Sequence, residues 1–177
     1  VKRLLGVIGL LALFVVGLAA CSNSDADSTA SSASSSGNTA KARTLDEIKK
    51  SGTIRIGVFS DKKPFGYVDD KGAYQGYDVY FANRLAKDLG VDVEYVAVDP
   101  ASRVEYLTSA KVDVILANFT VTDERAKQVD FALPYMKVAL GVVSPSQNLI
   151  SSVDDLKGKT LIVGKGTTAE TYFEEHY

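Results

Sequence analysis

The chain has 177 residues, of which 46% are hydrophobic and 24% charged, with a net charge of −2 and one cysteine. These proportions are typical of a soluble globular protein, and a single cysteine excludes an internal disulfide. The absence of a basic excess argues against nucleic acid as a partner, because phosphate binding requires clustered lysine and arginine. With His176 as the single histidine, neither a histidine-based metal site nor a Ser-His-Asp triad is expected, and no motif indicates a metal or cofactor.

The first 20 residues have the layout of a secretory signal peptide. Lys2 and Arg3 form a short basic region, and an apolar and glycine-containing run over 4–20 ends in small residues. The alternative is a transmembrane helix, for which this run lies near the short limit of about 17 residues. The segment Leu18-Ala19-Ala20-Cys21 resembles a bacterial lipobox, which implies that Cys21 is lipidated and becomes the mature N-terminus.

Residues 21–43 follow as a tether that begins at this lipidated cysteine. They are dense in serine, alanine and threonine and show no apolar periodicity, so we expect them to be disordered. An O-glycosylated stalk is the alternative that composition leaves open. Together, the two segments predict an exported protein that is lipid-anchored to the outer face of the cell membrane or lies in the periplasm.

Helix signals recur from residue 44 onward, each with a capping residue before an apolar pattern. Two of them have the capping-box spacing, Thr44 with Glu47 and Ser102 with Glu105. The predicted helices, with their caps, run over 44–50 (Thr44), 78–89 (Asp78), 102–109 (Ser102), 122–128 (Thr122) and from Thr167 onward, with a helical turn at 151–156.

Apolar runs between these helices predict strands over 53–59, 91–98, 112–116, 138–143 and 160–163. Residues 60–76 are rich in turn residues and predict a loop with a hairpin. Strands that alternate with helices predict an α/β fold with a largely parallel sheet, in which ligands bind at the carboxyl ends of the strands. No glycine-rich dinucleotide or phosphate-binding motif follows a strand, so a nucleotide is not indicated.

Two strand-to-helix turns carry groups that suit an anion. In the segment 118–125, unpaired backbone N–H groups, the Thr120 hydroxyl and the planar fork of Arg125 match a carboxylate. In the segment 164–168, glycines and the hydroxyls of Thr167 and Thr168 open the next helix. The alternatives are a capped surface helix with a solvated arginine and a turn without binding function.

Two further candidates concern a ligand's side chain. Arg103 follows the strand at 91–98 and is placed either to meet that side chain or to form a salt bridge on the helix surface. Phe59 and Tyr67 border the loop after the first strand, where aromatic residues can form the wall of a pocket.

Six short motifs occur in one order along the chain. They are Gly52-Thr53-Ile54-Arg55-Ile56-Gly57-Val58, Pro64-Phe65 with Gly76-Tyr77-Asp78-Val79, Val112-Asp113 with Thr120-Val121-Thr122-Asp123-Glu124-Arg125, Asp130-Phe131 with Pro134-Tyr135, Leu156-Lys157-Gly158-Lys159, and Gly166-Thr167-Thr168. Over residues 44–177 this order resembles the bacterial extracellular solute-binding proteins of family 3, which serve ABC importers of polar amino acids.

The resemblance implies a periplasmic-binding-protein-like type II fold of two α/β lobes that close on ligand. It places lobe 1 at 44–136, a hinge strand at 137–143 and the start of lobe 2 at 144–177. Family members usually run about 250 residues as one two-lobed unit. We therefore expect a C-terminally truncated chain whose first lobe is complete, whose second lobe is only begun, and which exposes apolar surface over 144–177.

The resemblance also implies binding roles. Arg125 would bind the α-carboxylate of an amino acid, aided by Thr120 and by Thr167 or Thr168, and the carbonyl of Asn118 would accept from the α-amino group. Phe59 occupies a position that often touches the ligand's side chain.

Ligand preference is implied by two further features. Arg103 matches a position where some acidic or cysteine-type binders carry an arginine, and residues 116–143 look most like the cysteine or cystine branch, with glutamate and aspartate binders close. Phe59 stands where many binders of basic or amide ligands carry an acid, so a cationic side chain is not favoured.

The function implied is capture of a polar amino acid for ABC permease subunits, by a monomer without catalysis. One alternative is an enzyme like cyclohexadienyl or arogenate dehydratase, which shares this fold and needs a positioned general acid or base such as Asp61 or Glu170. The other is the amino-acid-sensing domain of a larger receptor.

Overall fold

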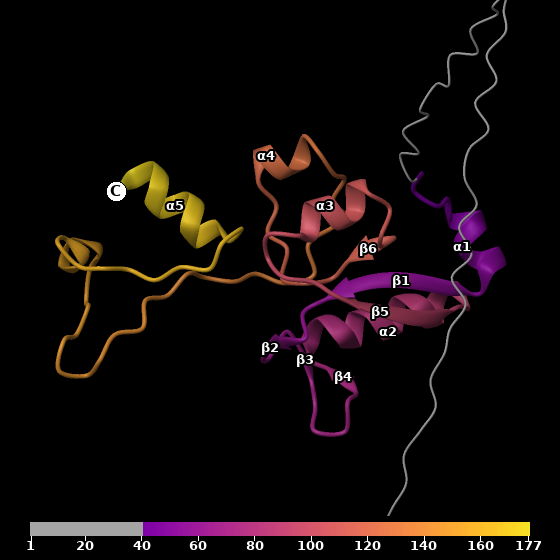
Figure 1. The fold of residues 1–177 in the computed structure, drawn as a ribbon, viewed down its shortest axis with the longest axis horizontal. Helices are drawn as coiled ribbons and strands as arrows, with labels where there is room; N and C mark the ends of the chain where they lie inside the picture. Colours follow the sequence, from indigo (N-terminus) through magenta and orange to yellow (C-terminus); the bar gives the residue numbers. More distant parts are fainter. Residues whose placement is uncertain (1–40) are drawn as a thin grey trace, which may run out of the picture. The chain divides into compact units, whose positions relative to one another are not determined.

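The computed structural model describes residues 41–177, which have an α/β architecture (Figure 1). The signal peptide predicted at 1–20, the lipidation of Cys21 and most of the tether predicted at 21–43 lie outside the described residues. No helix within 41–177 is long and apolar enough to cross a membrane.

The described chain contains helices and two small sheets. In chain order they are α1 (Leu45–Ser51), β1 (Thr53–Val58), β2 (Asp61–Lys62), β3 (Gly66–Val68), β4 (Tyr74–Gln75), α2 (Tyr77–Leu89), β5 (Asp92–Ala97), α3 (Arg103–Thr108), β6 (Val114–Ile115), α4 (Asp123–Ala126), the 3-10 helix η1 (Val153–Leu156) and α5 (Thr168–His176). One sheet is parallel in the order β5-β1-β6, and the other is antiparallel in the order β2-β3-β4. The predicted α/β class and the predicted hairpin within 60–76 are confirmed.

The register of the parallel sheet brings three loops to one edge. β1 pairs with β5 from Thr53–Asp92 to Val58–Ala97, and with β6 at Ile56–Val114 and Gly57–Ile115. Because parallel strands all end at the same edge, the loops that leave β1, β5 and β6 emerge side by side (Figure 1). This edge is where the candidate binding residues of the first lobe lie.

Helix α2 packs against β1 and β5 and closes the core. Its apolar stripe at helical spacing meets the apolar side chains of the central strand. The buried members of this cluster are Ile48, Ile54, Ile56, Val58, Val79, Ala82 and Ala86. Burying a valine or isoleucine side chain contributes about 1.5–3 kcal/mol, so this cluster holds the strand edge in place.

Several predicted helix ends are confirmed by the capping geometry. Thr44 and Glu47 form the predicted capping box at α1, and Gly90 ends α2 in a left-handed conformation. The hydroxyl of Thr122 accepts from the backbone N–H of Arg125, and that of Thr167 begins α5 in the same way. These caps involve residues within one turn of each other, so their spacing in the sequence was sufficient to predict them.

Two predicted caps are wrong. Gly76 lies at the cap position of α2, and Asp78 is buried inside the first turn, where it binds partners from elsewhere in the fold. At α3 the hydroxyl of Ser102 makes no cap bond. Instead, the carboxylate of Asp99 accepts from the backbone N–H groups of Ala101 and Ser102 at 2.8 and 2.9 Å, because a charged carboxylate is the stronger acceptor.

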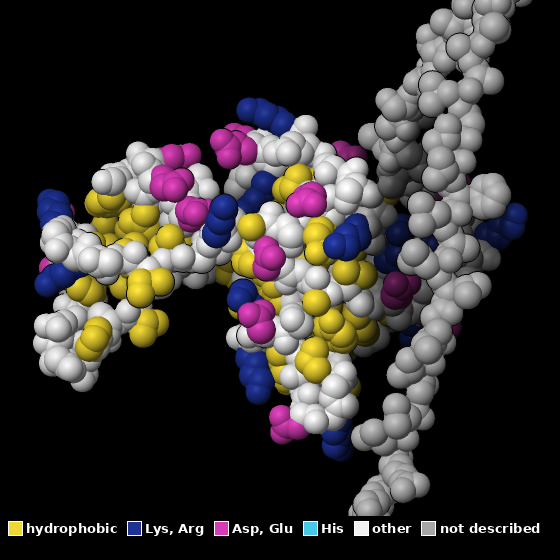
Figure 2. Space-filling model, viewed as in Figure 1, with side chains coloured by type: hydrophobic (Ala, Val, Ile, Leu, Met, Phe, Trp, Pro, Cys, Tyr) yellow, Lys and Arg dark blue, Asp and Glu magenta, His cyan; other side chains and the backbone are white. Residues whose placement is uncertain are grey.

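The strands predicted over 138–143 and 160–163 are also wrong. Neither segment pairs with another of residues 41–177, and a strand requires a ladder partner for its backbone groups. Val143 and Ile162 are 99% and 92% exposed. The predicted exposure of apolar side chains beyond residue 143 is confirmed, and Figure 2 shows them gathered over the segment that carries η1 and α5.

A buried carboxylate fastens the start of the described chain to the sheet. The side chain of Asp113, 1% exposed, accepts from Arg43 Nε at 2.9 Å and from Arg55 Nη2 at 2.7 Å, and also from the backbone N–H of Arg55 at 2.8 Å. Burial of this carboxylate opposes its ionisation, but the hydrogen bonds from the two arginines outweigh burial and hold the pKa of Asp113 well below its usual range.

Candidate functional site

A cleft of about 1190 Å³ opens at the carboxyl edge of the parallel sheet. Seven of the predicted binding residues line it, namely Phe59, Arg103, Asn118, Thr120, Arg125, Thr167 and Thr168. The opposite wall is formed by apolar residues from 138–143, 150–156 and 160–163. Residues that lie more than 100 positions apart in the sequence are therefore brought to one cavity, as the strand-edge rule predicts.

Arg125 enters this cleft from the first turn of α4. Its Nη1 donates to the carbonyl of Thr120 at 2.8 Å, and its Nη2 donates to the carbonyl of Gly166 at 3.0 Å. Burial lowers the pKa of Arg125 from its ordinary value, but an arginine remains charged in proteins. Two of its five N–H groups are used, so the others remain able to bind a carboxylate.

Arg103 lies deeper than either sequence interpretation expected. It is 3% exposed, and its guanidinium donates to the carbonyls of Pro100, Ala117, Asn118 and Gly166 at 2.9–3.0 Å. Burial, and then the charge of Arg125, lower the pKa of Arg103 to about 10. The alternative of a surface salt bridge is wrong, because Arg103 pairs with no carboxylate among residues 41–177 and four of its N–H groups are directed to backbone carbonyls.

The ring of Phe119 lies near both arginines. The guanidinium carbons of Arg103 and Arg125 are 4.5 and 4.9 Å from its centroid, within the range of cation–π attraction. The Phe59 ring lies 5.7 Å from the guanidinium carbon of Arg103. These aromatic contacts fix the planes of both guanidinium groups, a role for Phe119 that the sequence interpretation missed.

Hydroxyl groups of Thr120, Thr167 and Thr168 line the same cleft as Arg125. The hydroxyl of Thr167 is already engaged, because it donates to the Gly164 carbonyl at 2.7 Å and accepts from the Glu170 N–H. In contrast, the hydroxyls of Thr120 and Thr168 form no hydrogen bond with another of the described residues. Thr168 is also the first residue of α5, where backbone N–H groups lack helical partners.

Asn118 stands at the end of β6 in an unusual conformation that Asp78 holds in place. Its φ of +42° lies in the left-handed region, which asparagine tolerates better than most residues. The backbone N–H of Asn118 donates to Asp78 Oδ2 at 2.9 Å, and the Tyr135 hydroxyl donates to Asp78 Oδ1 at 2.7 Å. Asp78 thus supports the binding loop, and its place in the Gly76-Tyr77-Asp78 motif was the sequence signal for this role.

Burial raises the pKa of Asp78 above its ordinary value, and the hydrogen bonds from Tyr135 and Asn118 oppose that rise only in part. Since the native pKa is raised, the contribution of Asp78 to stability is fully present below its unfolded pKa of about 3.9 and is lost as pH rises through the native pKa. Ionised Asp78 therefore depends on its two donors at neutral pH.

We predict that Tyr135→Phe lowers the free energy of unfolding by about 1–3 kcal/mol at pH 7, because a buried carboxylate loses a donor. The loss should be smaller at pH 4, where Asp78 is more protonated. Urea unfolding at both pH values measures this difference. Tyr77→Phe is the matched control, since the Tyr77 hydroxyl makes one exposed bond of 3.3 Å. Equal losses for both variants at both pH values would contradict the role given to Asp78.

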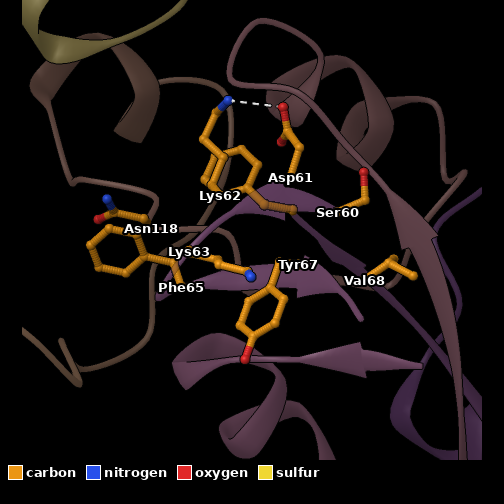
Figure 3. A pocket seen from close by; sticks show the side chains of 9 residues that line it. Ser60, Asp61, Lys62, Lys63, Phe65, Tyr67, Val68 and Asn118 are labelled. Carbon is orange, nitrogen blue, oxygen red and sulfur yellow. Dashed lines mark hydrogen bonds and ion pairs between the residues drawn. The ribbon is translucent and has the colours of Figure 1, made fainter. Parts of the chain in front are cut away.

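Tyr67 lies apart from the larger cleft. It lines an adjoining cavity of about 530 Å³ together with Phe59, Lys62 and Lys63 (Figure 3). The Nζ of Lys63 lies 4.8 Å from the Tyr67 ring centroid, and Lys62 is paired with Asp61 at 3.3 Å. Tyr67 thus shares this smaller cavity with Phe59 and Asn118, which also line the larger cleft, but it does not line the cleft that holds Arg103 and Arg125.

The charges in the larger cleft favour an anionic group. Among the described residues that line it, Lys62, Arg103 and Arg125 carry positive charge and none carries a carboxylate. Asp61 and Glu170, the carboxylates that an enzyme would need as acid or base, lie outside this lining. The arrangement is suited to bind a carboxylate beside an apolar wall.

Comparisons with known proteins show which family the chain resembles. The sequence profile of the bacterial extracellular solute-binding proteins, family 3, matches residues 54–169. The L-cystine-binding protein TcyJ of Escherichia coli (strain K12) is 34% identical over 134 residues, which cover 75% of this chain and 50% of that protein. The chain thus spans about half the length of this relative.

Two solved structures are similar in both sequence and fold. The cysteine-binding protein of Campylobacter jejuni is 60% identical, with a TM-score of 0.73 over 75% of this chain and 55% of that chain. A solute receptor for L-cysteine of Neisseria gonorrhoeae is 58% identical, with a TM-score of 0.74 over 76% of this chain and 56% of that chain.

Two further similarities bear on function. A cyclohexadienyl dehydratase of Pseudomonas aeruginosa is 29% identical over 133 residues, which cover 72% of this chain and 49% of the enzyme. The arginine-bound form of domain 1 from TmArgBP is 38% identical, with a TM-score of 0.50 over 52% of this chain and 73% of that domain.

Proposed function

The chain belongs to the bacterial extracellular solute-binding proteins of family 3, and we propose that it captures L-cysteine, or a closely similar polar amino acid, for an ABC importer. Support comes from the two cysteine-binding structures at 58–60% identity and from the L-cystine-binding relative. Family members act outside the cytoplasm, in keeping with an export signal.

The observation that carries this proposal is the position of Arg125 in the cleft. Its planar fork lines the same cleft as the unengaged hydroxyls of Thr120 and Thr168, a set of groups that matches the α-carboxylate common to all amino acids. The carbonyl of Asn118 is proposed to accept from the α-amino group. Phe59 is proposed to border the ligand's side chain, and Arg103 to lie behind it.

The division of the chain is also a proposal. Lobe 1 is assigned to 44–136, the hinge segment to 137–143 and the start of lobe 2 to 144–177. We propose that Cys21 carries the lipid anchor, that permease subunits in the membrane receive the ligand, and that the protein acts as a monomer. The arginine-bound single domain of a relative supports ligand capture by a first lobe that lacks most of the second.

The chain is proposed to bind its ligand without converting it. The family and the 58–60% identical neighbours are binding proteins, and the similarity to a cyclohexadienyl dehydratase makes that enzyme the second candidate. The carboxylates named as acid or base for such an enzyme, Asp61 and Glu170, lie outside the lining of the cleft.

Thermal melting tests both candidates on the purified chain carrying Cys21→Ser, which prevents a mixed disulfide with cysteine or cystine. The ligands are L-cysteine, L-cystine, L-glutamate, L-aspartate, L-glutamine and prephenate. A ligand at 100 times its dissociation constant stabilises the native state by about 2.7 kcal/mol. We expect L-cysteine to raise the melting temperature most and prephenate to be neither bound nor converted.

A rise in melting temperature with glutamate or aspartate alone would indicate that the chain binds an acidic amino acid instead of cysteine. Conversion of prephenate would favour the enzyme. A cooperative melt that no amino acid shifts would contradict amino acid capture by this chain.

A further inference from the structure

We infer that Gly166 is a positioning residue for ligand capture, because its carbonyl oxygen accepts from both Arg103 and Arg125 and so fixes the carboxylate-binding fork of Arg125. This inference rests on the proposed function for its consequence in binding. The contact itself is a property of the ligand-free chain.

Two guanidinium groups converge on one neutral acceptor. Arg103 Nη2 and Arg125 Nη2 each donate to the Gly166 carbonyl at 3.0 Å. The two positive charges repel each other because both groups contact the same oxygen atom. No carboxylate of residues 41–177 pairs with either arginine. A shared carbonyl offsets that repulsion, and the cation–π contacts of both guanidinium groups with Phe119 add to this stabilisation.

The backbone around Gly166 admits only glycine. Its φ is +74°, and a Cβ there would lie 2.5 Å from Ala101 Cα and 2.7 Å from the Pro100 carbonyl oxygen. These are backbone atoms of the turn after β5, so they cannot move aside as a flexible side chain would. The close approach is what allows the carbonyl to reach both arginines, and Glu170 holds the other side of the turn through the Gly166 N–H at 2.7 Å.

The consequence is a preorganised arginine. With Thr120 holding Nη1 and Gly166 holding Nη2, the plane of the Arg125 guanidinium is fixed before a carboxylate arrives. Ligand binding then costs less side-chain entropy and less reorganisation. Since the α-carboxylate is common to all amino acids, loss of this positioning should weaken every amino acid ligand by a similar factor.

Gly166→Ala is the test, with Gly158→Ala as the matched control. Gly158 has a similar φ of +71°, but a methyl group added there would meet no atom within 4 Å, so its alanine variant carries the backbone strain without the collision. We expect Gly166→Ala to weaken L-cysteine binding at least about tenfold relative to Gly158→Ala, and other bound amino acids by the same factor.

A second readout uses no ligand. Hydrogen exchange of the arginine Nη–H groups, followed by NMR and assigned with Arg125→Lys, should be faster for Arg125 in Gly166→Ala than in Gly158→Ala, because Gly166 accepts from Arg125 Nη2. Arg103→Lys gives an independent variant, because a lysine ammonium cannot reach the four carbonyls that Arg103 binds. It should likewise speed Arg125 exchange.

Unchanged Arg125 exchange in Gly166→Ala and Arg103→Lys would overturn the inference, as would equal affinities in Gly166→Ala and Gly158→Ala. Failure of the unsubstituted chain to bind any amino acid would instead contradict the proposed function, and the exchange measurement would still decide whether Gly166 positions Arg125.

Discussion

Replacing Arg125 with alanine is expected to weaken L-cysteine binding at least about 100-fold. Its fork is the charged donor proposed for the α-carboxylate, and hydrogen bonds to a charged group contribute about 1.5–3 kcal/mol each, where about 1.4 kcal/mol is tenfold in affinity. Arg125→Lys should weaken binding at least about tenfold, because a lysine keeps the charge but loses the planar fork.

Calorimetric titration of each variant measures these losses, and the loss should be similar for any amino acid that the chain binds. Arg84→Ala is the control, since Arg84 is exposed and forms its ion pair with Asp88 on the surface of α2. Binding by Arg125→Ala within about threefold of the unsubstituted chain would remove Arg125 from the proposed site.

Replacing Asp113 with asparagine is expected to lower the free energy of unfolding by about 3–5 kcal/mol at pH 7. The substitution leaves two arginines facing a neutral amide, and breaking a buried ion pair by removing one partner costs about this much. A single domain is stable by about 5–15 kcal/mol, so the variant should lose a large share of its stability.

The pH dependence of this loss follows from the depressed pKa of Asp113. Its contribution is present above the unfolded pKa of about 3.9 and is lost as pH falls through the lower native pKa, so the variant should lose less stability in acid. Urea unfolding checks both points. Asp154→Asn is the control, because Asp154 is 82% exposed in its pair with Lys157, and such pairs contribute about 0–1 kcal/mol. A loss at Asp113 no larger than at Asp154 would contradict the stabilising role given to the buried carboxylate.

The sequence was most informative where structure depends on near neighbours. Thr44, Thr122 and Thr167 each cap a helix through a residue three positions away, and the residue type at the start of each predicted helix was enough to identify them. The alternation of strands and helices likewise predicted the parallel sheet and the edge at which the cleft opens. From these two features the positions of Asn118, Thr120 and Arg125 followed.

The errors fall where distant residues decide the outcome. Aspartate is a residue type that often caps helices, but Asp78 is buried and accepts hydrogen bonds from Asn118 and Tyr135, which lie 40 and 57 positions away in the sequence. Arg103 is placed by the carbonyls of three separate loops, which no local pattern reveals. The apolar segments 138–143 and 160–163 have no strand partner among residues 41–177, so they form exposed irregular chain instead of strands.

The most direct test of the proposed function is a calorimetric titration of the chain, with Cys21→Ser, against L-cysteine and against cysteamine, which lacks the carboxylate. We predict saturable binding of L-cysteine at one site and no measurable binding of cysteamine. Equal binding of both compounds, or no binding of L-cysteine to a chain that still unfolds cooperatively, would contradict the carboxylate site at Arg125.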